Sequence, residues 1–190
     1  MNVYPIEAGN FKLDGGAMFG VVPKSLWTKT NPADADNMIE MSSRCMLVEN
    51  SDKLILVDTG MGDKQSEKFF KYYKRWGSDN LVKSINSAGF SIDDVTDVLL
   101  THLHFDHCGG AVAWDSTKEA YDVLFKNANY WSNEKHWGWA TNPNPREKAS
   151  FLDENLFPIK ESGQLKFINN MSKGFNSVSY THLRAHETGY

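Results

Sequence analysis

The chain has 190 residues, enough for one domain with a sizeable core. A hydrophobic content of 41% and a charged content of 23% are ordinary for a globular protein, and the net charge of −4 argues against nucleic acid as a partner. No stretch reaches the roughly 20 apolar residues that span a bilayer, so no membrane partner is expected. With only two cysteines and no visible signal peptide, we expect a cytoplasmic protein without a disulfide framework.

The first part of the chain is predicted to form strands and a loop. Residues 3–22 are typical of two short strands, with Gly15-Gly16 as a hairpin turn between them. Residues 24–41 are expected to form a loop over the face of the functional site. We expect the apolar side chains after the turn to join the core, with a place at the mouth of the site as the alternative; they are Met18, Phe19, Val21 and Val22.

Two strands over residues 45–49 and 54–57 come next, separated by turn residues. The second is a continuous apolar run, typical of a strand buried on both faces. It ends at Asp58, whose carboxylate is costly to bury unless it is hydrogen-bonded, so Asp58 either supports a site or caps the following turn. Asp58-Thr59-Gly60 also matches the triplet of aspartic proteases, but those enzymes pair two such aspartates and this chain has one copy.

Two helices and a strand are predicted before the main motif. Charged and aromatic residues alternate over residues 65–76 as in an amphipathic helix, and we expect its aromatic side chains in the core. A second helix is predicted over residues 80–87, ended by Gly89. A buried strand over residues 95–100 then leads directly into the stretch that holds most of the chemistry.

Four potential metal ligands lie within six positions after this strand: His102, His104, Asp106 and His107. If strand geometry continues through Thr101, His102 and His104 project to the same side and can reach one ion. Asp106 and His107 follow on the loop, where they can reach a second ion. Imidazole and carboxylate ligands suit zinc, with Mn²⁺ or Fe²⁺ as alternatives. Packing alone gives no reason for this spacing, so we predict a metal site.

Such a site provides a nucleophile. Two cations that share a water lower its pKa from about 16 toward 7, which makes hydroxide available at neutral pH. The hydroxide then attacks a carbonyl or phosphoryl centre. Asp106, near the shared water, can also handle the proton given to the leaving oxygen. We therefore assign Asp106 a catalytic role in addition to its role as a ligand.

The pattern H-x-H-x-D-H at residues 102–107, after a hydrophobic strand and with D-T-G upstream at residues 58–60, resembles the metallo-β-lactamase superfamily. Within it the chain is most similar to the bacterial branch that includes the N-acyl homoserine lactonases. Residues 15–23 and the spacing between the two motifs support this second likeness. The resemblance covers about residues 3–168, and it is far more specific for the superfamily than for a substrate.

The resemblance implies an α/β fold, the αββα sandwich, of which this chain holds the N-terminal part. It implies a di-zinc hydrolase whose metal-bound hydroxide attacks a lactone or ester carbonyl of a small molecule, such as an N-acyl homoserine lactone. It also implies that Asp58 supports the metal ligands. A thioester hydrolase of the glyoxalase II type uses the same motif and is the alternative enzyme. A non-catalytic metal-binding remnant is the alternative outside enzymes.

The region after the metal motif is expected to complete the packing. Cys108 is predicted to be a small packed residue, because the ligand set does not require it. Three tryptophans over residues 131–139 are expected to pack, with a substrate cap or a homodimer interface as the alternative, and His136 among them is not expected to bind metal. The elements predicted here are strands over residues 121–125, 129–131 and 165–168 and helices over residues 133–139 and 146–156.

Residues 177–190 depart from the rest of the chain and resemble a translated sequencing-adapter tail, so we expect an incomplete domain over residues 1–176. His182 and His186 in this tail have a spacing that can bind zinc, but we do not expect them to do so. The superfamily pattern also needs a third histidine and a bridging aspartate later in the chain. Each ion would keep about two protein ligands, fewer than the three usual at catalytic zinc. We predict that this chain binds metal weakly and turns over poorly.

Overall fold

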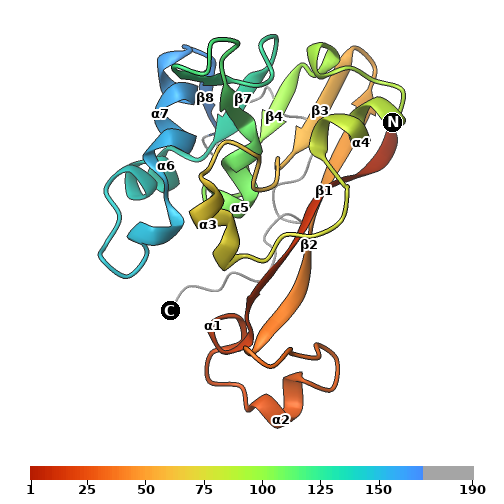
Figure 1. Cartoon of the computed structure of the whole chain (residues 1–190). Helices are drawn as coiled ribbons and strands as arrows, with labels where there is room; N and C mark the ends of the chain where they lie inside the picture. Colours follow the sequence, from red (N-terminus) through yellow and green to blue (C-terminus); the bar gives the residue numbers. More distant parts are fainter. Residues whose placement is uncertain (169–190) are drawn as a thin grey trace.

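A six-stranded sheet organises the computed structural model, which describes residues 1–168 (Figure 1). Its strands lie in the order β1-β2-β3-β4-β7-β8; the first three pair antiparallel, and β3, β4, β7 and β8 pair parallel. The predicted boundary at residue 176, the tail and its two histidines lie outside the described residues. The strands are β1 (Asn2–Asp14), β2 (Met38–Asn50), β3 (Lys53–Val57), β4 (Asp97–Leu99), β7 (Asn129–Ser132) and β8 (Leu165–Phe167), with β5 (Val112–Trp114) and β6 (Tyr121–Val123) in a second, two-stranded sheet.

The two central strands, β3 and β4, are buried on both faces, as predicted, although β4 begins with the buried Asp97. Every residue from Leu54 to Val57 is at most 5% exposed, and Val98 and Leu99 are buried beside them. Val57 pairs with Leu99 in the parallel register, so β3 and β4 end at the same edge of the sheet. The segments that follow these two strands therefore start side by side, and both contain predicted site residues.

β1 and β2 extend beyond the rest of the sheet as a two-stranded arm (Figure 1). The arm carries two short helices at its tip, α1 (Gly15–Phe19) and α2 (Lys24–Trp27). Its register shifts between Glu7 and Asn10, where Gly9 has a φ of +128°. Residues 24–41 were predicted to be a loop. They instead form α2, a connection and the first part of β2.

The predicted hairpin turn at Gly15-Gly16 is wrong. Asp14 accepts a hydrogen bond from Ala17 N at 2.8 Å and caps α1. Gly15 packs against Trp27, and a Cβ at Gly15 would lie 2.3 Å from the indole ring. The glycine pair therefore begins a helix, because an N-cap side chain precedes it and an aromatic ring leaves no room for a side chain.

The apolar residues at the tip of the arm do not join the core, contrary to prediction. Val21 is 96% exposed, Met18 45% and Val22 44%. Phe19 stacks on Trp27, with ring centroids 5.0 Å apart. Because the arm leads away from the sheet, these side chains pack on one another or face solvent.

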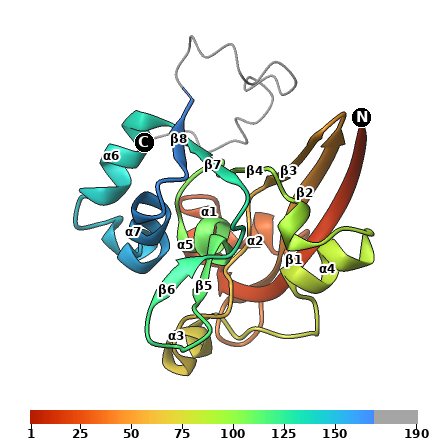
Figure 2. The same ribbon diagram turned by 90° about the horizontal axis from the view of Figure 1, so that it is seen from above.

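The helices of the body cover both ends of the sheet. α4 packs on β1, whereas α6 and α7 lie beside β8 at the other end (Figure 2). The predicted helix over residues 146–156 is wrong in its first half, because η3 is a single 3₁₀ turn and α7 begins only at Asp153. None of the helices within residues 1–168 is long and apolar enough to cross a bilayer. The helices are α3 (Glu67–Tyr72), α4 (Leu81–Ser87), α5 (Phe105–Cys108), α6 (Glu134–Thr141) and α7 (Asp153–Glu161), with 3₁₀ turns η1 (Ile92–Asp94), η2 (Gly109–Ala111) and η3 (Lys148–Ser150).

The aromatic helix α3 is only partly buried. Phe69, Phe70 and Tyr73 pack against a small core cluster, whereas Tyr72 lies at the surface. Phe105 belongs to this cluster and contacts Phe69, with ring centroids 5.4 Å apart. Since Phe105 begins α5, the cluster anchors one side of the segment with the predicted metal ligands.

Candidate metal centre

Asp58 follows β3 directly and contacts both ends of the segment after β4. Its φ of +59° lies in the left-handed region, which aspartate tolerates better than most residues. The carboxylate accepts hydrogen bonds from Thr101 N at 2.8 Å and Thr101 Oγ1 at 2.7 Å, and Oδ2 lies 2.9 Å from His107 Nδ1. These partners compensate the cost of placing a carboxylate at the end of a buried strand.

The loops after β3 and β4 are in close backbone contact. Thr59 N donates a hydrogen bond to His107 O at 2.8 Å. A Cβ at Gly109 would lie 2.2 Å from Met61 O, and one at Gly110 would lie 2.2 Å from Thr59 O. The Gly-Gly pair after the histidines is therefore required because a side chain at either position would separate the two loops.

Lys64, which was not predicted as a site residue, joins this contact from the interior. The residue is 4% exposed, and its Nζ donates a hydrogen bond to Gly109 O. Burial lowers the pKa of Lys64 to about 8, although the nearby Cys108 and Glu154 oppose the shift. A lysine between Asp63 and Gln65 looks like a surface residue in the sequence, and no local pattern indicates its burial.

The four predicted ligands lie close together, although not by the strand alternation that we considered. β4 ends at Leu99, so strand geometry does not continue through the histidines. The ring centroids of His102 and His104 are 4.7 Å apart, and those of His102 and His107 are 3.9 Å apart. Asp106 Oδ2 lies 3.6 Å from His107 Nε2. The turn into α5 therefore gathers three imidazoles and a carboxylate.

The chemistry of these donors fits a divalent metal. Burial, together with the neighbouring His107 and His104, lowers the pKa of His102 to about 2, so this imidazole is neutral at physiological pH, as a metal ligand must be. Imidazole and carboxylate are donors that zinc takes. Within residues 1–168, however, no group of three or more histidine, cysteine, aspartate or glutamate side chains is arranged so that it could hold a metal ion.

Leu103 lies between two of the predicted ligands, and its backbone N–H and C=O groups are both hydrogen-bonded to side chains. Its N–H donates a hydrogen bond to His136 Nε2 at 3.0 Å, and Cys108 Sγ donates one to Leu103 O at 3.3 Å. Burial raises the pKa of the Cys108 thiol to about 12, so the thiol stays protonated, as expected for a packed residue. Burial, and then His104, lowers the pKa of His136. The contact between His136 and Leu103 was not predicted, because 33 residues separate the pair.

Aromatic side chains from the following segment border the histidines. His104 lies 4.8 Å from Phe151 between ring centroids, and Trp139 lies 6.3 Å from the same ring. Trp137 is buried and Trp131 Nε1 donates to Asp97 Oδ1 at 2.7 Å, which agrees with the packing role predicted for these two tryptophans. Trp139 is partly exposed instead, beside the candidate site.

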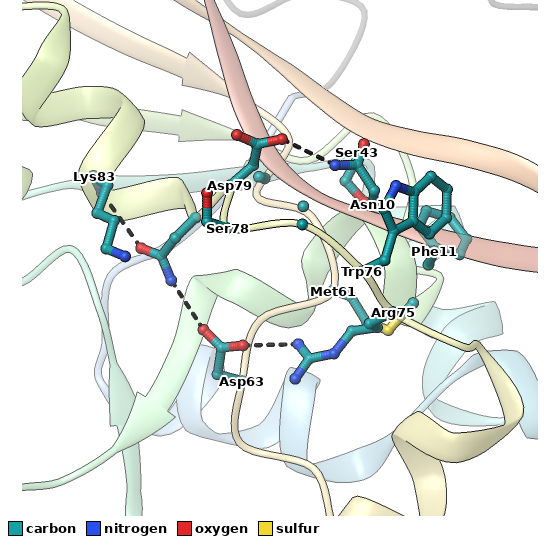
Figure 3. Close-up of a pocket in the computed structure, with 14 residues that line it drawn as sticks. Asn10, Phe11, Ser43, Met61, Asp63, Arg75, Trp76, Ser78, Asp79 and Lys83 are labelled. Carbon is teal, nitrogen blue, oxygen red and sulfur yellow. Dashed lines mark hydrogen bonds and ion pairs between the residues drawn. The ribbon is translucent and has the colours of Figure 1, made fainter.

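A separate polar pocket of about 360 Å³ lies between β1 and residues 75–80 (Figure 3). Arg75 donates a hydrogen bond to Asp63 at 2.7 Å, and Asn10 donates one to Asp79 at 2.9 Å. None of the four predicted metal ligands lines it. The side chains that line the pocket hydrogen-bond to one another and hold residues 75–80 against β1. We therefore assign the pocket a structural role.

Comparison with known proteins agrees with this geometry. A family model described as the metallo-beta-lactamase superfamily matches residues 39–168. An N-acyl homoserine lactonase from Bacillus cereus is 29% identical over 104 residues, which are 50% of this chain and 40% of that protein. A probable metal-dependent hydrolase from Staphylococcus aureus, solved as a crystal structure, superimposes with a TM-score of 0.79 and 30% identity over 88% of this chain and 58% of that chain.

A dizinc quorum-quenching lactonase, AidC, superimposes with a TM-score of 0.65 and 26% identity, over 94% of this chain and 60% of its own. The chain thus spans between about two fifths and three fifths of the length of these relatives. The predicted fold class is confirmed by these superpositions. Because the match runs from β2 to β8 and includes the segment with the gathered histidines, the chain belongs to the metallo-β-lactamase superfamily.

Proposed function

We propose that the protein is a metal-dependent hydrolase that opens a lactone or ester carbonyl, with two zinc ions as the favoured metals. The observation that supports this proposal is the grouping of three imidazoles and one carboxylate on the segment after β4. Asp58 is hydrogen-bonded to the last of these imidazoles, that of His107. Mn²⁺ or Fe²⁺ would accept the same donors.

The four ligands divide into two pairs in this proposal. His102 and His104 are assigned to one ion, and Asp106 and His107 to the other. When bound, the cations polarise the carbonyl oxygen and lower the pKa of water. The Asp58 carboxylate accepts a hydrogen bond from Nδ1–H of His107, which leaves Nε2 as the nitrogen that would bind a metal. We assign Asp106 the proton that passes to the leaving oxygen.

The substrate proposal follows from the relatives and from the surroundings of His104. The Bacillus cereus relative is named as an N-acyl homoserine lactonase, and AidC was solved with an acyl-homoserine product. Trp139 is partly exposed and packs on the buried Phe151, which contacts His104, so its indole ring offers an apolar contact for an acyl chain near His104. We therefore propose an N-acyl homoserine lactone or a related acyl ester.

The test is hydrolysis of N-hexanoyl homoserine lactone and of S-lactoylglutathione by the purified protein, with and without a chelator. We expect lactone hydrolysis that the chelator abolishes. Hydrolysis of the thioester alone would favour the glyoxalase II-type alternative, and metal binding without either activity would favour a non-catalytic protein. A purified protein that is metal-free and indifferent to chelators would refute the proposal.

Asp106→Asn tests the catalytic role of Asp106. We expect turnover to fall roughly 100-fold, in line with the loss of a general acid–base group, and metal content to fall as well. Asp52→Asn, in the exposed turn between β2 and β3, is the matched control. Full activity of Asp106→Asn would remove this role.

A further inference from the structure

We propose that His136 is a positioning residue for residues 102–107, which we call the ligand-bearing segment. It fixes this segment by accepting a hydrogen bond from the Leu103 N–H. The proposal rests on the proposed function, because its importance depends on His102 and His104 holding metal. Leu103 is the residue between these two ligands, so a rotation of its peptide changes the direction of both imidazoles. The hydrogen bond of 3.0 Å from Leu103 N to His136 Nε2 opposes this rotation.

The sheet places His136 beside this peptide. β7 pairs with β4 in parallel, and Leu100 N donates to Trp131 O at 3.0 Å, so β7 ends next to the point where the ligand-bearing segment begins. Asn133 then caps α6, accepting from His136 N at 3.2 Å. The first turn of α6 therefore stands against the segment, with the backbone of His136 fixed by the cap.

The burial of Leu103 makes the acceptor necessary. Leu103 has no exposed surface, and a buried N–H without a partner is costly. Cys108 holds the carbonyl of the same residue, so both polar groups of Leu103 are engaged by side chains. The ring of His136 is itself held against Phe151, which also contacts His104.

The same geometry argues against His136 as a third ligand in this arrangement. An imidazole nitrogen that accepts a hydrogen bond uses the lone pair that would bind a metal. Nε2 of His136 is occupied in this way by Leu103 N–H, so Nδ1 carries the proton of the neutral ring. His136 thus acts on the metal ligands through the backbone and not as one of them.

Three variants separate the possible roles of His136. His136→Gln keeps an acceptor at about the reach of Nε2, because its amide oxygen is the same number of bonds from Cα. His136→Asn is one bond shorter and does not reach Leu103, and His136→Phe keeps a ring but has no acceptor. Lys135→Ala, an exposed neighbour in the same turn of α6, is the matched control.

Two readouts are measured on the 190-residue chain. Hydrogen exchange of the Leu103 amide, followed by NMR without metal, reports the contact itself. A Co²⁺ titration followed by visible absorption reports the affinity and geometry of the ligands. Urea unfolding of each variant identifies any that fail to fold; if His136→Phe is one of them, the comparison of His136→Gln with His136→Asn decides.

We expect His136→Gln to keep Leu103 protected and to bind Co²⁺ within about 3-fold of the wild type. His136→Asn and His136→Phe should lose the protection and bind Co²⁺ about 10-fold more weakly or worse, as for other outer-shell partners of metal ligands. Wild-type affinity in His136→Phe would overturn the proposal in favour of packing. Equal losses in all three variants, with a changed Co²⁺ spectrum, would overturn it in favour of direct coordination.

Failure of the proposed function would look different. In that case the wild-type chain would show no Co²⁺ spectrum that depends on His102 or His104, although the Leu103 amide could still be protected by His136. The positioning role alone fails if Co²⁺ binds through His102 and His104 while loss of Leu103 protection leaves the affinity unchanged.

Discussion

The Asp58 carboxylate lies 2.9 Å from Nδ1 of His107, a residue 49 positions later in the chain. The contact is possible because β3 and β4 are parallel neighbours that end together at Val57 and Leu99. The same carboxylate accepts from Thr101 N. A single side chain thus holds the beginning and the end of the segment that contains the candidate ligands.

Asp58→Asn tests the importance of this contact. The asparagine tolerates the φ of +59°, and its amide oxygen can still accept a hydrogen bond from Thr101, but its NH₂ group cannot accept the hydrogen bond from His107 Nδ1–H. We expect metal affinity to fall about 10- to 100-fold, as for other partners of metal-binding histidines, with little change in the urea unfolding midpoint. Calorimetric titration with zinc measures the first and circular dichroism the second. An unchanged affinity, equal to that of Asp52→Asn, would contradict the role of Asp58.

Gly110→Ala tests the close contact between the two loops. Its Cβ would lie 2.2 Å from Thr59 O, so the loops must separate, at a cost of about 1–3 kcal/mol in the free energy of unfolding. Gly138→Ala is the control, because no atom outside its own stretch of helix lies within 4 Å of the added Cβ and the site is an exposed position of α6. There we expect a gain of up to about 1 kcal/mol from helix propensity. Equal effects of the two substitutions in urea denaturation would show that the contact is not tight.

Zinc binding by the 190-residue chain is expected to be weak. The proposal assigns two protein ligands to each ion, whereas catalytic zinc sites usually have three. Calorimetry should give a dissociation constant in the micromolar range or weaker, and His102→Ala should weaken it further. Replacing both His182 and His186 by alanine removes any contribution of the tail and should change nothing. Nanomolar affinity for two ions per chain would contradict the prediction.

The centre of the fold could be predicted because its residues interact mainly with apolar neighbours. A strand buried on both faces has few alternatives to a continuous apolar run, and residues 54–57 are such a run. The H-x-H-x-D-H segment was equally recognisable, since its ligands are close in sequence as well as in space. Their roles as ligands stay predictions until metal binding is measured.

The remaining features depend on contacts between distant residues. Gly15-Gly16 begins a helix because Asp14 caps it and the Trp27 ring covers it, and two glycines in a sequence show neither. His136 and Lys64 gain their partners only when β7 and the loop after β3 are placed beside the ligand-bearing segment. Local sequence patterns do not record such approaches, so these residues were found only in the structure.

The buried Lys64 predicts how stability depends on pH. Its pKa falls from 10.5 to about 8 on folding, with burial as the main cause. Below about pH 8, Lys64 is protonated in both the folded and the unfolded state. Between about pH 8 and 10.5 the unfolded chain keeps a proton that the folded chain has lost, so this group makes the folded state more stable as pH rises.

The full gain corresponds to about 3 kcal/mol at 1.36 kcal/mol per pKa unit. Lys64→Met removes the titrating group while keeping most of the apolar side chain. The unfolding free energy of the wild type minus that of the variant should therefore increase by about 3 kcal/mol from pH 7 to pH 10.5. Urea denaturation of both proteins at several pH values measures it, because the other titrating groups contribute equally and cancel. Parallel curves for the two proteins would show that Lys64 titrates alike in the folded and unfolded states.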